Sequence, residues 1–266
     1  TGDFPEIQDG GTEPDSTELE GLKPKLTVAT YNVENFHAGT NPEKVERIAE
    51  TMVENLNTPD IIGLVEVQDN NGPTDDGTVD ASESYQTLIE AIEAAGGPSY
   101  EFSDIAPQDK VDGGQPGGNI RVGFLYNPDR VSMTDKPAGD ATTAVAVDDN
   151  GLTLNPGRID PTNEAFEDSR KVLAGEFEFN GEKITVIANH FNSKGGDGAL
   201  FGSEHPVVLG SEEQRLQQAE VVNGFVQDLM DEDPNANVVV LGDLNDFEFS
   251  APVQTLKGDV LTNMVE

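Results

Sequence analysis

The sequence predicts a layered α/β protein with at least six central strands. From Leu26 onward, strand and helix patterns alternate along the chain, as they do in proteins whose sheets are covered by helices. Apolar residues make up 35% of the chain and gather in compact runs such as ITVIA and VVVLG, which favours a buried core over a disordered chain. No repeat of fixed period occurs, so neither a solenoid nor a propeller is expected.

Three strand patterns and two helix patterns occupy the first half of the chain. The strands are expected over Leu26–Val33, Asp60–Val67 and Ile120–Tyr126. One helix should begin at Pro42, because apolar residues recur at helical spacing after it. The other is expected over Glu83–Ala95, where the following Gly96-Gly97 stops it.

The second half begins with an irregular stretch, residues 134–168, which we expect to be a long functional or family-specific loop. Lys171–Phe179 and Glu182–His190 then predict a hairpin, because Asn180-Gly181 is a strong two-residue turn signal. The remaining predicted elements are a long amphipathic helix over Ser211–Met230 and a buried strand over Asn237–Gly242.

The chain is strongly acidic. Its 51 Asp and Glu outnumber 15 Lys and Arg, which gives a formal net charge of −36. This balance excludes a basic nucleic-acid-binding module held by bulk charge, and it excludes a polybasic membrane anchor. A surface of this kind repels itself at ordinary salt, whereas molar salt screens the repulsion. We therefore expect a protein adapted to high salt.

Residues 1–24 differ from the rest of the chain. They are acidic, aperiodic and rich in Gly, Pro and Thr, which predicts a linker or a loosely attached N-terminal arm. Residues 25–266 are expected to form one domain. The chain has no Cys, so neither a disulfide nor a thiolate ligand contributes to it.

Polar residues stand where the predicted buried strands end. They are Asn32, Glu66, Asn189, His190, Asp243 and Asn245. One such residue is usually a satisfied polar group of the core, but four strand ends of this kind point to a shared site at one sheet edge. Glu66 and Asp243 are hard oxygen ligands, which suit Mg²⁺ or Mn²⁺ better than zinc. His190 is a candidate general acid or base.

Four motifs occur in a recognisable order. They are YNVENF at Tyr31–Phe36, IIGLVEV at Ile61–Val67, NHFNSKGG at Asn189–Gly196 and GDLND at Gly242–Asp246. Together they resemble the endonuclease/exonuclease/phosphatase superfamily, and within it the extracellular nucleases of halophilic and marine microbes. The resemblance implies a four-layer α/β sandwich, in which two mixed β-sheets pack face to face with helices outside.

The resemblance also implies roles for the strand-end residues. Glu66 would be the metal-ligand carboxylate, and Asn32 would lie beside the metal and the scissile phosphate. His190 would hydrogen-bond that phosphate or protonate the leaving group. Asp243 would orient or activate the attacking water, with Asn245 steadying the phosphate. The metal would be Mg²⁺, with Mn²⁺ as an alternative and a structural Ca²⁺ left open.

Four basic residues are candidates for contact with substrate phosphates. Arg170 is similar to the arginine that pancreatic-type deoxyribonucleases use on the DNA backbone. Lys171 and Lys194 lie beside the motifs. Arg121 lies in the strand IRVGFLY, which is similar to a segment of the family.

The C-terminal part departs from the family pattern. Family members continue past GDLND for several strands and carry a Ser-Asp-His motif, whose His is usually the principal general base. The 20 residues after Asp246 contain no such motif. We therefore expect residues 25–266 to be a C-terminally incomplete domain, which a further segment or fragment would complete.

The leading hypothesis is a secreted or cell-surface, Mg²⁺-dependent phosphodiesterase that hydrolyses nucleic acid, in particular DNA, in a high-salt environment. A phosphatase or phospholipase of the same superfamily is the first alternative. No membrane partner is expected, because the sequence lacks an exposed aromatic hairpin run. The alternative from another class is a catalytically impaired binding or structural shell.

Overall fold

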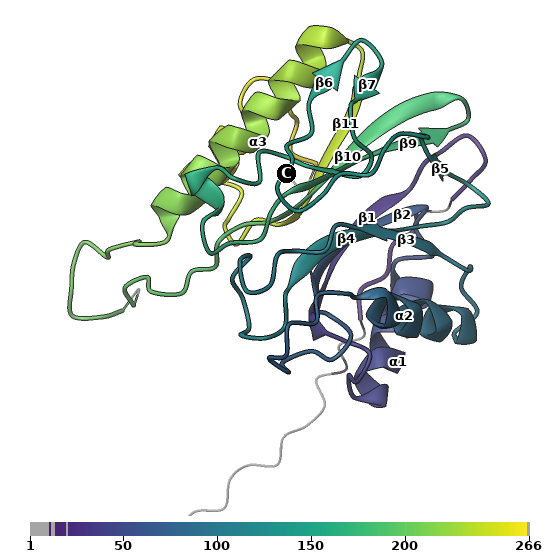
Figure 1. Ribbon diagram of the computed structural model, residues 1–266, viewed down its shortest axis with the longest axis horizontal. Helices are drawn as coiled ribbons and strands as arrows, with labels where there is room; N and C mark the ends of the chain where they lie inside the picture. The colour runs from purple at the N-terminus through teal and green to yellow at the C-terminus, as the bar shows by residue number, and fades with distance from the viewer. Residues whose placement is uncertain (1–10, 12–13, 20, 200, 265–266) are drawn as a thin grey trace, which may run out of the picture.

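Two β-sheets pack face to face, with helices on the outer face of each (Figure 1). The computed structural model describes residues 11, 14–19, 21–199 and 201–264. The first sheet has the strand order β1 (Val28–Phe36), β2 (Ile61–Val67), β4 (Arg121–Tyr126) and β3 (Glu101–Asp104). The second has the order β11 (Asn237–Asp243), β10 (Glu182–His190), β9 (Leu173–Phe179) and β5 (Ser132–Met133). The predicted sandwich of two mixed sheets is confirmed.

Helices complete the layers. The first sheet is covered by α1 (Pro42–Glu50), which continues as the π-helical turn η1 (Thr51–Asn55), and by α2 (Ser82–Ala94). The second is covered by α3 (Glu212–Glu232) and α4 (Ala251–Lys257). The predicted helices thus form, and Asn41 caps the N-terminus of α1 by accepting a hydrogen bond from Glu43 N.

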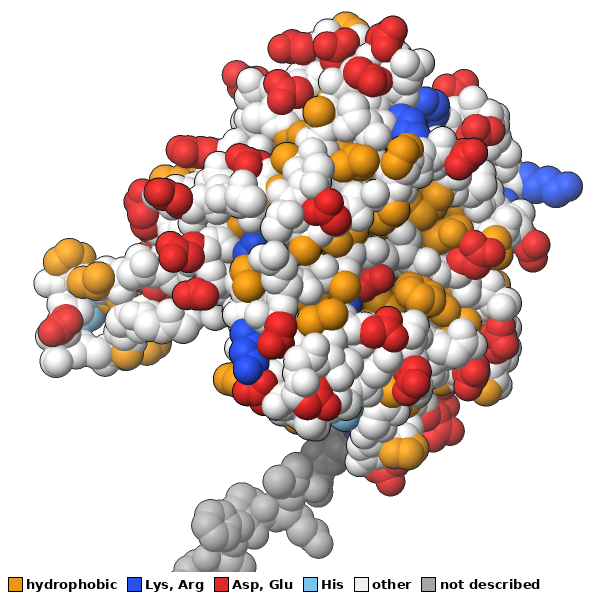
Figure 2. Space-filling model, viewed as in Figure 1, with side chains coloured by type: hydrophobic (Ala, Val, Ile, Leu, Met, Phe, Trp, Pro, Cys, Tyr) orange, Lys and Arg blue, Asp and Glu red, His pale blue; other side chains and the backbone are white. Residues whose placement is uncertain are grey.

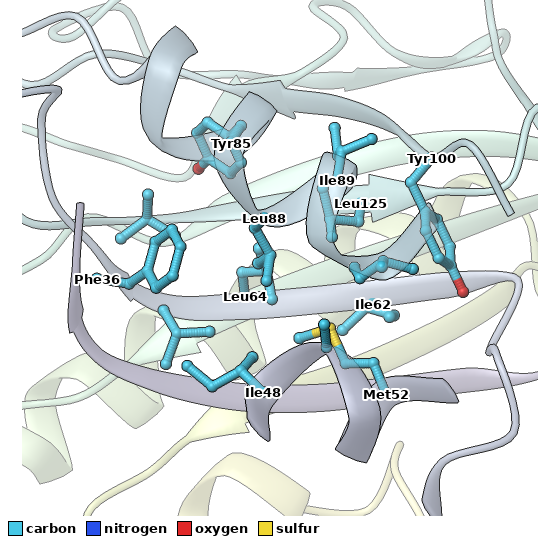
Figure 3. Close-up of a cluster of buried hydrophobic side chains, with 14 of the residues drawn as sticks. Phe36, Ile48, Met52, Ile62, Leu64, Tyr85, Leu88, Ile89, Tyr100 and Leu125 are labelled. Carbon is cyan, nitrogen blue, oxygen red and sulfur yellow. The ribbon is translucent and has the colours of Figure 1, made fainter. Parts of the chain in front are cut away.

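Three apolar clusters hold the layers together. Figure 3 shows the first, where Ile48 and Met52 from the α1–η1 helix and Leu88 from α2 pack on Leu64 of β2. A second lies between the sheets and a third lies under α3 and α4. Burying a single large apolar side chain stabilises the fold by about 1.5–3 kcal/mol. The middle cluster therefore fixes the position of one sheet relative to the other.

The sheets approach closely near their shared edge. A Cβ at Gly63 of β2 would lie only 2.2 Å from Leu241 Cδ1 of β11, so a side chain there would force Leu241 to move. Among the described residues, β1 and β11 each pair on one side only, β1 with β2 and β11 with β10. Both are edge strands, and β11 is partly exposed along most of its length.

Residues 134–168 contain only short regular pieces, as the sequence predicts. They are β6 (Val147–Asp148), β7 (Gly151–Leu152), β8 (Gly157–Arg158) and the 3-10 turn η2 (Glu164–Phe166). β6 pairs with β7, and β8 pairs with β9. The segment therefore packs over the second sheet as an irregular layer.

Part of the predicted N-terminal arm, residues 1–10, 12–13 and 20, lies outside the described residues. The rest contacts the body: Thr17 N donates to Asn55 O at 2.9 Å, and Asn57 Nδ2 donates to Leu19 O at 2.8 Å. Acidic side chains are spread over the visible face of the molecule (Figure 2). None of the helices in the described ranges combines the length and the apolar character needed to span a bilayer.

Candidate active site

The predicted convergence of strand ends takes place. β1 runs parallel to β2, so Asn32 lies opposite Val65 and beside Glu66. β10 runs parallel to β11, so His190 lies opposite Asp243. Because the carboxyl ends of parallel strands meet at one edge, these four polar side chains come together across the gap between the two sheets. An open cavity of about 340 Å³ beside them is lined by Asn32, Asp243, Asn245 and Asp246, among others.

The amide of Asn32 bridges two carboxylates. Its Nδ2 donates to Glu66 Oε1 at 3.0 Å and to Asp243 Oδ2 at 3.2 Å. The second oxygen of Glu66 accepts a hydrogen bond from Asn35 N at 3.0 Å. Asn32 therefore links the first sheet to the second and holds the two negative groups in a fixed relation.

A break in the strand register aims Glu66 at the site. The β2–β4 register shifts between Val65 and Val67, and Glu66 takes the unusual φ of +67°. Such irregularities re-aim a side chain at the cost of local strain, and the cost is tolerated where the surroundings hold the residue in place. The hydrogen bonds from Asn32 and Asn35 do so here.

Asp243 and Asn245 are positioned by the turn that follows β11. Asn245 N donates to Asp243 Oδ1 at 2.9 Å, while Asn245 Nδ2 donates to Phe191 O at 3.0 Å. Gly242 precedes them with a φ of +130°, and a Cβ there would lie 2.0 Å from Asn189 O. The glycine of GDLND is thus required for β11 to lie this close to β10 beside the carboxylate.

Arg170 supports His190 from behind. Arg170 Nε donates to His190 Nδ1 at 3.2 Å, and the same guanidinium donates to Phe191 O at 2.9 Å. Both side chains are buried. Since Nδ1 accepts this hydrogen bond, the proton of a neutral imidazole is on Nε2. Nε2 lies 3.8 Å from Glu66 Oε1, on the side of the carboxylates.

Electrostatics favour the neutral form of His190. Burial, and then the nearby Arg170 guanidinium, lower the pKa of His190 to about 3, although Asp243 acts in the opposite direction. The imidazole is therefore uncharged near neutral pH and presents an N–H donor at Nε2. Of the roles implied for this residue, the geometry favours hydrogen bonding to a phosphate oxygen over proton transfer.

The structure places two of the four predicted phosphate-contacting residues away from the site surface. Lys171 is buried, and its Nζ donates to Phe166 O at 2.6 Å and to Ser169 O at 2.8 Å. Arg121 is also buried, where it donates to Asn119 O and pairs with Asp104 at 3.1 Å. Their charges offset buried partners, so neither side chain is free to bind substrate.

The other two predicted contacts lie at or near the site. Arg170 touches His190, but its guanidinium is held by protein groups, so its reach toward substrate is limited. Lys194 is more exposed and lies 3.0 Å from Asp246 Oδ1, at the rim of the cavity. Sequence reasoning missed Asn35, whose backbone N–H holds Glu66, because a backbone donor leaves no trace in residue type.

The donor set fits a magnesium-type ion. Glu66 and Asp243 offer carboxylate oxygens on one edge, and Mg²⁺ in proteins is commonly held by one or two carboxylates with water completing its shell. In the described ranges, no three His, Cys, Asp or Glu side chains gather as a metal cluster.

Comparison with known proteins agrees with the fold. The model of the endonuclease/exonuclease/phosphatase family matches residues 154–260, which include Arg170, His190, Asp243 and Asn245. No curated protein matches the chain in sequence. The human Nocturnin catalytic domain with bound sulfate anion is 13% identical, with a TM-score of 0.52 over 90% of this chain and 72% of that one. An endonuclease/exonuclease/phosphatase family protein from Leptotrichia buccalis is 14% identical, with a TM-score of 0.50 over 88% and 74%.

The two structures, at 13% and 14% identity, share the fold with this chain. The expected resemblance to the endonuclease/exonuclease/phosphatase superfamily is confirmed by the family model over residues 154–260 and by the shared fold. The motifs at Tyr31–Phe36 and Ile61–Val67 lie outside the matched range, and the link to nucleases of halophilic and marine microbes stays a prediction. Members of this superfamily are nucleases, phosphodiesterases and phosphatases.

Proposed function

We propose that the protein is an Mg²⁺-dependent phosphodiesterase that hydrolyses nucleic acid, in particular DNA. The observation that carries the proposal is the bridge from Asn32 to Glu66 and Asp243, with His190 beside it, at an open cavity. Two carboxylates and a neutral N–H donor on one rigid edge suit a reaction in which an anionic phosphate is bound and attacked by water.

Each residue then has a distinct task. Glu66 and Asp243 would hold the metal ion, which supplies Lewis-acid stabilisation of charge on the phosphoryl group. His190 Nε2–H donates to a non-bridging phosphate oxygen. Asp243 lies where a carboxylate can orient the attacking water, and Asn245 fixes Asp243 through its backbone N–H. Arg170 keeps the imidazole in the donating tautomer.

The test is hydrolysis of supercoiled plasmid, single-stranded DNA and RNA in molar KCl, with Mg²⁺ and again with excess EDTA. We expect cleavage of DNA that EDTA abolishes and added Mg²⁺ restores. A phosphomonoester and sphingomyelin vesicles serve as comparison substrates, and faster turnover of either would favour the phosphatase or phospholipase alternative. Binding of DNA without cleavage would favour the impaired shell.

We propose that a further segment of the family's C-terminal kind, paired to an open edge strand, raises activity by supplying a general base. Adding synthetic peptides of that kind and measuring the hydrolysis rate tests this.

We also propose that the protein works outside the cell or on its surface, in concentrated salt. The supporting observation is the net charge of −36.

Salt should stabilise the fold strongly. Raising KCl from about 0.1 to 2 M should raise Tm by on the order of 10 °C, because screening removes repulsion among the acidic side chains. Differential scanning calorimetry at fixed pH measures the shift. Glycine betaine at equal osmolality is the control, since it adds no ionic strength. Equal stabilisation by betaine, or no shift with KCl, would contradict salt adaptation by charge.

A further inference from the structure

An exposed pair of aromatic rings lies in the loop between β11 and α4. Phe247 and Phe249 are 58% and 73% exposed. Their ring centroids are 5.4 Å apart and their planes differ by only 8°, so the rings are stacked. Neither side chain belongs to the three apolar clusters that hold the layers together. Core packing therefore does not account for this pair.

The pair adjoins the candidate active site. Phe247 is two residues beyond Asn245, so its Cα lies at most about 7 Å from that of Asn245. Phe247 N donates to Asp246 Oδ1 at 3.1 Å, and Asp246 lines the cavity. Asp246 is itself fixed by Arg215 Nε at 2.9 Å. The aromatic loop is thus anchored at the rim of the cavity.

Lys194 completes the arrangement. Its Nζ lies 4.4 Å from the centroid of the Phe247 ring and 3.0 Å from Asp246 Oδ1. Phe247 therefore contacts a cation and a second ring. Phe249 is the more exposed of the two, so it is the ring better placed to receive a further planar group. Lys194 would then face the adjoining phosphate.

Charge alone cannot provide affinity for a nucleic acid here. The chain carries a net charge of −36, and Arg170 is buried against His190 and Phe191 O. Phosphate contacts weaken further as salt rises. Stacking of bases on aromatic side chains contributes about 1–3 kcal/mol per base and depends little on base identity. Stacking of this kind would provide affinity for a nucleic acid that the acidic surface does not attract.

We propose that Phe247 and Phe249 form a stacking platform for an unpaired nucleobase next to the scissile phosphate, with Phe249 as the contacting ring. This inference rests on the proposed function, since it assigns that function a substrate class: single-stranded or locally unpaired nucleic acid, read without base specificity. Double-stranded DNA would be cleaved where its ends or bubbles open.

Steady-state kinetics on a single-stranded oligonucleotide test the platform. Phe249→Leu should raise KM about tenfold, which corresponds to about 1.4 kcal/mol of lost binding, with kcat changed less than about twofold. Phe249→Tyr should restore the KM, because it keeps the ring. Phe201→Leu is the matched control, since Phe201 is 96% exposed in the segment between β10 and α3. On a substrate lacking the bases that flank the scissile bond, Phe249→Leu should show no added defect.

A fluorescence titration gives a readout apart from hydrolysis. The chain has no Trp, so Phe249→Trp introduces the only indole. In an Asp243→Asn background, which prevents cleavage, oligothymidylate with Mg²⁺ in molar KCl should quench this indole, and an abasic polymer of equal length should not. Equal quenching by both polymers would overturn the platform.

The two proposals fail in different ways. Hydrolysis by the unaltered chain, with the same KM in Phe249→Leu, would overturn the platform and leave the phosphodiesterase standing. No hydrolysis by the unaltered chain, with base-dependent quenching of the indole, would contradict the phosphodiesterase and support the platform.

Discussion

Replacing Asp243 with Asn should lower kcat for phosphodiester hydrolysis by about two to four orders of magnitude while the fold stays intact. The substitution keeps the shape of the side chain, and its one amide oxygen can still accept from Asn245 N. Only the hydrogen bond from Asn32 Nδ2 is lost, and the site is open to solvent, so Tm should change little. The substitution removes the negative charge that, in the proposed function, would hold the metal ion and orient the attacking water. Rates of plasmid nicking and oligonucleotide cleavage at saturating Mg²⁺ measure the loss.

Glu66→Gln should have a comparable effect, and the double variant should lose little more than either single one, because the two carboxylates act as a unit. Glu248→Gln is the matched control: it removes the same charge from an exposed position in the loop that follows Asp243. Unchanged nicking in Asp243→Asn, or an equal loss in Glu248→Gln, would disprove the site assignment.

Replacing Asp112 with Asn should destabilise the protein by about 3–5 kcal/mol, the usual cost of leaving a buried charge without its partner. Asp112 is buried, with Arg158 at 2.9 Å from one oxygen and Lys171 Nζ at 3.4 Å from the other. Neither oxygen accepts a hydrogen bond of good geometry from a described residue, so charge pairing alone offsets its burial. Burial also lowers the pKa of both Lys171 and Arg158.

Urea denaturation in molar KCl measures this loss as a fall in the midpoint at constant slope. Asp75→Asn is the control, because Asp75 forms an exposed pair with Lys110 and such pairs contribute little to stability. If both variants unfold at the same urea concentration, the pairing of Asp112 with Arg158 and Lys171 does not stabilise the fold.

The candidate site could be predicted from the sequence because its residues follow apolar strands. Glu66 and Asp243 each end a buried apolar run, so their side chains are expected at the end of a strand. Parallel pairing then brings these strand ends together. The direction of a side chain is harder to predict. Arg170 and Lys171 are neighbours, yet in extended backbone alternate side chains point to opposite faces. One therefore meets His190 and the other meets Asp112.

Elements that depend on a partner could not be predicted. β5, β6, β7 and β8 have two residues each, too few for any periodicity, and exist only because a neighbouring strand accepts their hydrogen bonds. The four-residue edge strand β3 and the short helix α4 are missed for the same reason. The irregular register at Glu66 also leaves no pattern, since the tertiary contacts of Asn32 and Asn35 impose it.

The open edges of β1 and β11 make association between copies of the chain depend on salt as well. An unpaired strand edge is a template for pairing with another molecule, and proteins commonly guard such edges with charge. Here the whole acidic surface provides that protection, because two copies repel each other before their edges meet. The salt that stabilises a single copy also screens this repulsion between copies. We therefore expect salt to raise the stability of the fold and to lower the resistance to aggregation, so that the protein is both folded and monomeric only within a limited range of ionic strength.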